Sequence, residues 1–122
     1  MNRNTHFGQF ISDLRMRHSM GSQDLAKRVG ISTAYLSQLE HGVRQNPDAD
    51  IIMKIAKALD LTKQETAAFY DMYAEATGQL SPDIAEYAKS NKLVQKALRY
   101  ALDVHAADDV WERFIEQLKN EQ

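Results

Sequence analysis

The 122-residue sequence contains no cysteine, only two prolines and only five glycines. Without cysteine, the chain has no disulfide framework, no thiolate metal site and no cysteine nucleophile. No run of apolar residues approaches the roughly 20 that are needed to span a bilayer. The N-terminal segment MNRNTHFGQF also lacks the apolar core of a signal peptide. These absences lead us to expect a soluble protein of the reducing cytoplasm.

Residue patterns typical of catalysis are missing as well. The four histidines are scattered through the chain and do not have the spacing of metal ligands. Asp108 and Asp109 are more typical of a helix start than of a catalytic carboxylate pair. The sequence contains neither a glycine-rich phosphate loop nor a nucleophile elbow. We therefore expect no enzymatic activity, no metal and no cofactor.

What the chain does contain is helix-forming sequence. Hydrophobic residues make up 43% of the chain, and β-branched residues are sparse. This length and composition predict an all-α protein with one domain, or one small domain with an extension.

Charge is distributed unevenly along the chain. Residues 1–60 carry eight basic and six acidic side chains, whereas residues 61–122 carry seven basic and eleven acidic ones. Phosphates attract the basic half and repel the acidic half, so we expect only the first half to approach nucleic acid. A difference of this size also arises by chance in small proteins.

The segment from Ser22 to His41 is typical of two short helices joined by a tight turn. Ala26 supplies the small residue that a steep helix crossing requires, and Gly30 tolerates the positive φ of the turn. We expect Ser22 and Ser32 to cap the two helices. An ordinary helical hairpin shares this apolar spacing, but agreement at seven positions favours a helix-turn-helix that binds DNA. Those positions are Leu25, Ala26, Val29, Gly30, Ile31, Leu36 and Leu39.

Apolar spacing predicts further helices on both sides of this unit. The expected ranges are 5–18, 48–59, 62–77, 82–89, about 93–102, and a last helix from about 108. Thr62 and Glu65 have the spacing of a capping box, and Gly78 is expected to end the helix that they begin. We expect residues 1–77 to form a DNA-binding domain and residues 78–122 to form a C-terminal helical extension.

The segment from about Phe7 to Leu61 resembles the DNA-binding domain of the lambdoid phage repressors, the Cro/cI type or XRE family. The matching motifs are Ser22-Gln23-Asp24-Leu25-Ala26, Val29-Gly30-Ile31-Ser32 and Tyr35-Leu36-Ser37-Gln38-Leu39-Glu40-His41-Gly42. Arg44 and Pro47 also fit the family pattern, whereas His41 stands where the family usually has asparagine. The resemblance covers a little under half of the chain. It implies a five-helix lambda-repressor-like domain and binding to short palindromic operators. The apolar spacing after Gly78 predicts that two or three C-terminal helices follow this domain.

A recognition helix reads base edges with residues near its N-terminus. Gln38 can form a bidentate pair with adenine, and Ala34 or the Thr33 methyl group can meet a thymine methyl group. The resemblance places these three residues at base-contact positions. Tyr35 either reaches a base or phosphate or packs on the surface. The predicted base contacts are Thr33, Ala34, Tyr35, Ser37 and Gln38.

Phosphate contacts would fix the register of the protein on the duplex. The N-terminus of the first helix of the unit can cradle a phosphate, and the resemblance implies further backbone contacts from the loop after the second helix. The predicted phosphate contacts are Ser22, Gln23, Ser32, Arg44 and Asn46. Secondary candidates, each of which can equally be a plain solvated charge, are Arg15, Arg17, Lys27 and Arg28. The phosphate contact that asparagine makes in the family is left open at His41.

One helix-turn-helix buries too little surface for high specificity, so we expect a homodimer that reads two half-sites. Apolar C-terminal residues are candidates for the dimer or partner interface, or they fold back onto the monomer core. They are Leu98, Leu102, Trp111, Phe114, Ile115 and Leu118.

Three functions fit these features. We favour a dimeric, sequence-specific transcriptional regulator, a repressor on a palindromic operator of double-stranded DNA. The alternatives are the antitoxin of a toxin–antitoxin pair, whose C-terminal helices bind a partner protein, and an adaptor that has lost DNA binding.

Overall fold

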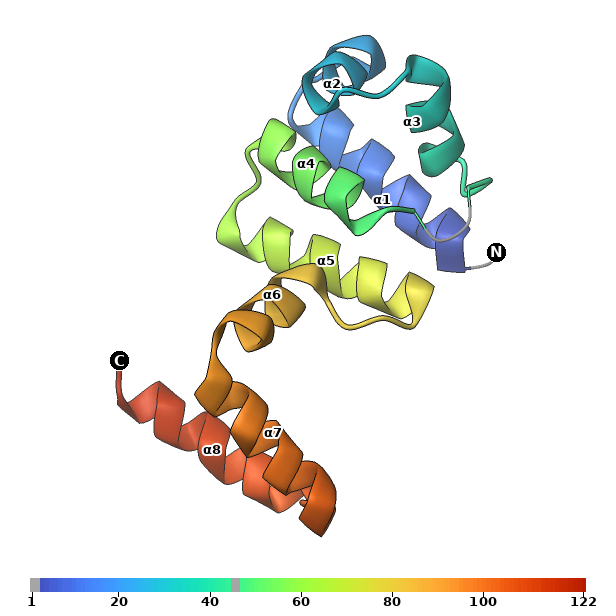
Figure 1. Ribbon diagram of the computed structural model, residues 1–122. Coiled ribbons are helices and arrows are strands. Elements are labelled where there is room, and N and C mark those ends of the chain that lie inside the picture. Colours follow the sequence, from blue (N-terminus) through green and yellow to red (C-terminus); the bar gives the residue numbers. More distant parts are fainter. Residues whose placement is uncertain (1–2, 45–46) are drawn as a thin grey trace. The chain divides into compact units, whose positions relative to one another are not determined.

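The computed structural model describes residues 3–44 and 47–122, and these residues form eight α-helices and no strand (Figure 1). The helices are α1 (Arg3–Arg17), α2 (Ser22–Val29), α3 (Thr33–Glu40), α4 (Ala49–Leu59), α5 (Lys63–Thr77), α6 (Pro82–Ser90), α7 (Lys92–Val104) and α8 (Asp108–Asn120). The predicted all-α fold, with five helices followed by a C-terminal set of three, is confirmed. No helix in the described ranges is both long enough and apolar enough to cross a membrane.

The chain divides into two compact units, Met1–Ala85 and Glu86–Gln122. This division falls within α6 rather than at residue 77, so α5 and the start of α6 belong to the first unit. The functional boundary between residues 1–77 and 78–122 stays a prediction.

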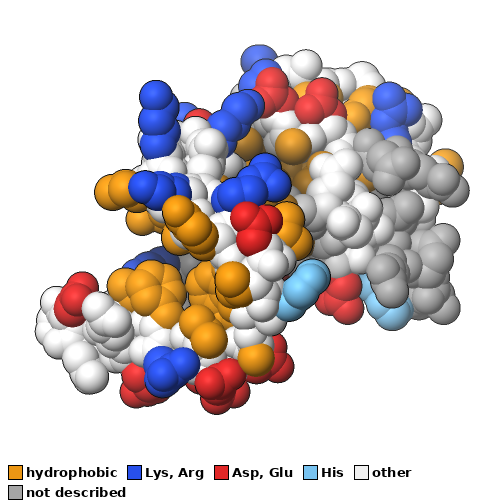
Figure 2. Space-filling view, turned by 60° about the horizontal axis from the view of Figure 1, so that its bottom comes forward, with side chains coloured by type: hydrophobic (Ala, Val, Ile, Leu, Met, Phe, Trp, Pro, Cys, Tyr) orange, Lys and Arg blue, Asp and Glu red, His pale blue; other side chains and the backbone are white. Residues whose placement is uncertain are grey.

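The second unit is built from the end of α6 and the helices α7 and α8. Asn91 caps α7, because its side chain accepts hydrogen bonds from the N–H groups of Leu93 and Val94 at 3.0 and 3.3 Å. Neither α7 nor α8 contains a buried residue. Both helices have large exposed apolar side chains, among them Leu98, Leu102, Phe114 and Leu118. Figure 2 shows hydrophobic side chains exposed on the face of the protein that it draws.

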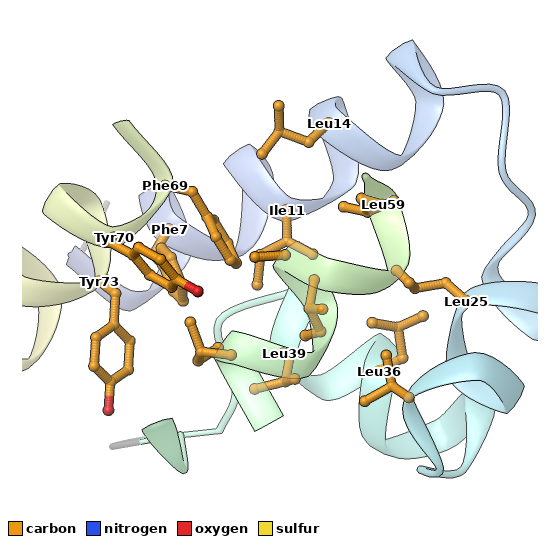
Figure 3. Close-up of a cluster of buried hydrophobic side chains, with 14 of the residues drawn as sticks. Phe7, Ile11, Leu14, Leu25, Leu36, Leu39, Leu59, Phe69, Tyr70 and Tyr73 are labelled. Atoms are coloured by element: carbon orange, nitrogen blue, oxygen red, sulfur yellow. The ribbon is translucent and has the colours of Figure 1, made fainter. Parts of the chain in front are cut away.

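The first unit has a continuous hydrophobic core around α1 (Figure 3). Helix α1 packs against α3 and α5, while α2 packs against α3 and α4. The rings of Phe7 and Phe69 stack with their centroids 5.4 Å apart, which ties α1 to α5. Because α1 contacts both α3 and α5, the helix-turn-helix is fixed to the rest of the unit. The core residues are Phe7, Ile11, Leu14, Leu25, Ala26, Val29, Leu36, Leu39, Ile52, Ile55, Ala56, Leu59, Phe69, Tyr70 and Tyr73.

Helix α5 begins with the predicted capping box. The N–H of Glu65 donates to the Thr62 hydroxyl at 3.1 Å, and the N–H of Thr62 donates to the Glu65 carboxylate at 3.0 Å. His18 Nε2 lies 3.0 Å from the same carboxylate, and Arg17 donates to it at 3.2 Å. The hydrogen bond from the Thr62 backbone, helped by those from His18 and Arg17, lowers the pKa of Glu65 to about 2 and outweighs the opposite effect of desolvation.

This depressed pKa predicts a specific sensitivity to acid. A carboxylate whose folded pKa lies below its unfolded value stabilises the fold above the unfolded value, and that stability is lost as the pH falls through the folded pKa. We expect a Glu65→Gln variant to be less stable than the unchanged protein at neutral pH, and to lose less further stability between about pH 5 and pH 2. Urea unfolding across this pH range measures the difference. Parallel loss of stability in the two proteins would contradict the assignment.

Candidate nucleic-acid interface

The turn between α2 and α3 has the geometry that the sequence predicts. Gly30 adopts φ +87°, in the left-handed region that a side chain disfavours, and its N–H donates to the Ala26 carbonyl at 2.9 Å. The N–H of Ile31 donates to the same carbonyl at 3.0 Å. Ala26 itself is 2% exposed, which is consistent with a small residue at the helix crossing. The turn therefore sets the direction in which α3 leaves α2.

Helix α3 presents one polar face to solvent. Leu36 and Leu39 point into the core and are almost completely buried. Four of the five predicted base-contact residues are exposed on the other side of the helix: Thr33, Ala34, Ser37 and Gln38. The burial of the two leucines thus fixes which face of α3 a ligand can reach.

Tyr35, the fifth predicted base contact, is half-buried and packs against the core. The Arg44 guanidinium carbon lies 4.2 Å from the centre of its ring. The N–H groups of Val43 and Arg44 both point to the Gln38 carbonyl, at 3.0 and 3.4 Å, so the chain turns back beside the last turn of α3. Tyr35 therefore supports Arg44 by a cation–π contact next to the exposed face. The predicted phosphate contact at Asn46 lies outside the described residues.

The start of α2 differs from the prediction. Its N-cap is Gly21, without a side-chain hydrogen bond, and Ser22 is the first helical residue rather than the cap. Gly21 has a φ of −73° and a ψ of 155°, the extended values that are typical of an N-cap residue, and glycine is a common residue at that position. Among the described residues, no side chain caps the N–H groups of the first turn of α2, which leaves them available to an outside acceptor. Ser22 is half-buried and Gln23 is exposed at this end.

Ser32 is the N-cap of α3, as expected. Its hydroxyl accepts a hydrogen bond from the Tyr35 N–H at 3.0 Å. The hydroxyl proton is not used in that bond, so the exposed Ser32 side chain can still donate to a phosphate oxygen.

His41 ends α3 and is exposed. Its Nδ1 lies 2.8 Å from the Ser37 carbonyl oxygen and 3.3 Å from the Ser37 hydroxyl oxygen. These contacts hold the ring against the last turn of α3.

An ion pair that sequence reasoning missed joins α1 to the end of α3. Arg15 donates to the two carboxylate oxygens of Glu40 at 2.8 and 2.9 Å, and to the Met20 carbonyl at 3.1 Å. The two charged side chains are only 16% and 9% exposed. The guanidinium of Arg15, a secondary candidate for a phosphate contact, is thus engaged within the protein, and its phosphate contact stays a prediction. No local pattern signals this ion pair, because the two partners lie 25 residues apart.

The net acidic charge that follows residue 60 in the first unit lies on α5 and the start of α6 rather than on α3. Residues 61–85 carry one basic and four acidic side chains, so most of the acidic excess of the second half of the chain belongs to α5 and the start of α6. Helix α5 lies across α1 and apart from α2 and α3 (Figure 1). This separation lets the exposed face of α3 approach a polyanion without the α5 carboxylates facing it.

Comparison with known proteins bears on the same segment. Residues 11–65 match the protein family described as Helix-turn-helix. An uncharacterized HTH-type transcriptional regulator of Mycobacterium tuberculosis is 42% identical over 57 residues, which cover 47% of this chain and 40% of that protein. The chain thus matches less than half of the length of this relative.

Two further similarities extend over more of the chain. The HTH-type transcriptional regulator SinR of Bacillus licheniformis is 26% identical over 99 residues, which cover 79% of this chain and 88% of that protein. A solved SinR protein/SinI protein complex aligns with 94% of this chain and 96% of its own, at a TM-score of 0.48 and 19% identity. Residues 11–65, with their tight turn and exposed second helix, thus form a helix-turn-helix segment that is similar to the Cro/cI-type (XRE) family, as the sequence predicts.

Proposed function

We propose that the chain is a sequence-specific DNA-binding transcriptional regulator, a repressor that binds a palindromic operator as a dimer. The observation that carries the proposal is the exposed polar face of α3, held in position by the helix-turn-helix core. Thr33, Ala34, Ser37 and Gln38 contact base edges from this face. A bidentate pair of hydrogen bonds between a side chain such as Gln38 and a base contributes about 1–3 kcal/mol of discrimination against a wrong base.

Phosphate contacts come from both ends of the reading face. On one side, the N–H groups of the first turn of α2, near Ser22 and Gln23, donate to a phosphate, and the Ser32 hydroxyl donates to a phosphate oxygen as well. On the other side, Arg44 is held against the Tyr35 ring beside the last turn of α3. In this arrangement Tyr35 acts mainly by positioning Arg44.

The second unit supplies the dimer interface in this proposal. Its six candidate residues are accessible, for example Leu102 at 61% and Phe114 at 46% exposure. Four of the six line two separate hollows: Trp111 and Phe114 line one, and Leu98 and Leu102 line the other. A two-helix unit without buried side chains gains stability when a partner covers its apolar surface. The same association would bring two reading helices onto one operator.

Gln38→Ala and Arg44→Ala test the reading face. With an operator selected from random duplexes, we expect Gln38→Ala to lose about 1–3 kcal/mol of specific binding per half-site, with little change on random DNA. Arg44→Ala should weaken both kinds of binding and reduce the slope of log K against log salt by about 1 per protomer. Fluorescence anisotropy with the full chain measures both effects.

Gln64→Ala is the matched control, because it makes the same chemical change at an exposed position on α5. We expect it to bind the operator like the unchanged protein. Unchanged operator affinity in Gln38→Ala would rule out the assigned reading face. Absence of any specific duplex from the selection, at low salt, would rule out the proposed function.

A further inference from the structure

A buried tyrosine on α5 holds the chain at the point where it enters α4. The Tyr73 hydroxyl donates a hydrogen bond to the Pro47 carbonyl oxygen at 2.9 Å, and the two residues lie 26 positions apart in the sequence. Tyr73 is 2% exposed, and its ring centroid lies 5.7 Å from that of Phe7 (Figure 3). The ring is therefore fixed in the core of the first unit, and its hydroxyl end fixes Pro47.

The Pro47 carbonyl depends on this hydroxyl. Pro47 is buried, and among the described residues no other group donates to its carbonyl oxygen. Burial, together with the charge of Asp48, raises the pKa of the Tyr73 hydroxyl, so this group remains a proton donor at neutral pH. Without the donor, the buried carbonyl loses its partner, and the chain gains free energy by moving the carbonyl toward water. The hydrogen bond thus fixes the chain just before α4.

The same connection between α3 and α4, which we call the α3–α4 segment, carries Arg44 at its other end. The N–H groups of Val43 and Arg44 point to the Gln38 carbonyl on α3, and the guanidinium lies over the Tyr35 ring. Arg44 and Pro47 are three residues apart in the chain, which spans at most about 11 Å when fully extended. The position of Pro47 therefore limits where Arg44 can lie. Helices α3 and α5 hold the segment from its two ends.

We infer that Tyr73 is a positioning residue for the contact of Arg44 with the DNA backbone. The inference rests on the proposed function and adds α5 to the elements that build the interface. By holding Pro47, the hydroxyl keeps the α3–α4 segment in place before DNA binds, so less ordering is needed during binding. Base reading does not depend on this bond, because Leu36 and Leu39 anchor α3 in the core. Tyr73 therefore supports affinity for the DNA backbone and leaves sequence discrimination unchanged.

Tyr73→Phe tests the inference in the full chain, because it removes the hydroxyl and leaves the ring in the core. We expect binding to the selected operator and to random duplex to weaken equally, by about three- to tenfold per protomer, since the freed segment must be ordered on binding. The ratio of the two affinities should stay within about twofold of the original. Fluorescence anisotropy measures both affinities, and circular dichroism checks the fold at the temperature used. Unchanged affinity for both duplexes would overturn the inference.

Tyr70→Phe is the matched control, because it removes a hydroxyl from another buried tyrosine one turn earlier on α5. Tyr70 is 7% exposed and lines a hollow between α4 and α5 rather than the α3–α4 segment. The two tyrosine hydroxyls point in different directions in Figure 3. We expect Tyr70→Phe to bind both duplexes like the unchanged protein. Equal weakening in the two variants would mean that any lost hydroxyl of α5 has this effect, which would contradict a specific role of Tyr73.

Combination with Arg44→Ala separates positioning from a general structural effect. If Tyr73 acts through Arg44, Tyr73→Phe should weaken binding by less than about twofold further in a chain that already contains Arg44→Ala. Effects that simply multiply would show that Tyr73 acts elsewhere and would overturn the inference. A lower ratio of operator affinity to random-duplex affinity in Tyr73→Phe would also overturn it, because that result would indicate a displaced reading helix.

Amide hydrogen exchange, followed by NMR, tests the positioning without DNA. The Val43 N–H lies 3.0 Å from the Gln38 carbonyl oxygen, and it should exchange about fivefold faster in Tyr73→Phe, because the segment opens more often. Tyr70→Phe should leave this rate unchanged. Equal rates at Val43 in Tyr73→Phe and the unchanged protein would overturn the inference. Faster exchange, combined with an unchanged protein that binds no duplex, would count against the proposed function and leave the anchoring of the segment by Tyr73 intact.

Discussion

Replacing Gly8 with alanine is expected to destabilise the first unit and to displace the end of the reading helix. A Cβ atom at Gly8 would lie 2.3 Å from the Leu39 carbonyl oxygen and 2.6 Å from that of Glu40. Both are backbone atoms of α3, so no side-chain rotation relieves the contact. Overpacking of this kind costs about 3 kcal/mol at its upper end, and the better helix propensity of alanine offsets about 1 kcal/mol.

We therefore expect Gly8→Ala to lower the free energy of unfolding by about 2 kcal/mol or more. Urea unfolding followed by far-UV circular dichroism measures this, and operator binding should weaken with it. Gly21→Ala is the control, because nothing lies within 4 Å of a Cβ at that position. Its only expected cost is the poorer N-cap of α2, less than about 1 kcal/mol. Equal stability of Gly8→Ala and the unchanged protein would show that α1 and α3 are not in such close contact.

Removing the guanidinium of Arg15 is expected to have the second large effect. Arg15→Leu leaves the Glu40 carboxylate, which is 9% exposed, without a cation. Loss of one partner of a largely buried pair costs about 3 kcal/mol, chiefly because the remaining charge is desolvated and unpaired. The end of α3 also loses its link to α1. We expect lower stability in urea and weaker operator binding.

Two comparisons isolate the cause. Arg28→Leu breaks an ion pair with Asp24 whose side chains are 56% and 51% exposed, and it should cost less than about 0.5 kcal/mol. Removing both charges, in Arg15→Leu with Glu40→Leu, should recover part of the stability that the single change loses. A double variant less stable than Arg15→Leu alone would mean that the carboxylate is not the source of the loss.

Much of the fold follows from local sequence. The Thr62 and Glu65 capping box and the glycine at residue 30 each act within a few residues of the chain, so their patterns predict where helices begin and turn. Leu36 and Leu39 mark the inner side of α3 by spacing alone, and the exposed side follows from them. At Ser22 the local pattern was misleading, because Gly21 also tolerates the extended N-cap conformation and takes that place.

Contacts between distant segments were not predictable in this way. Arg15 has the position of an ordinary cation in a last helical turn, and Gly8 has that of a tolerated glycine in a helix. Their roles depend on the end of α3, which only the packed core brings to them. The charge pattern shows the same limit: most of the net acidic excess after Leu61 lies in the first unit, on α5 and the start of α6 rather than on the reading face.

By itself, the sequence determined that the chain is all-helical, that residues 22–41 form a helix-turn-helix, and which residues of α3 face outward. These properties depend on periodicity, caps and a turn glycine, all of which act over one or two helical turns. Only the tertiary structure decided how α3 is held, through Gly8 and the pair of Arg15 with Glu40. It also decided that α7 and α8 leave an apolar groove uncovered. Both depend on which surfaces meet when distant segments bury their apolar sides, and local spacing does not specify that.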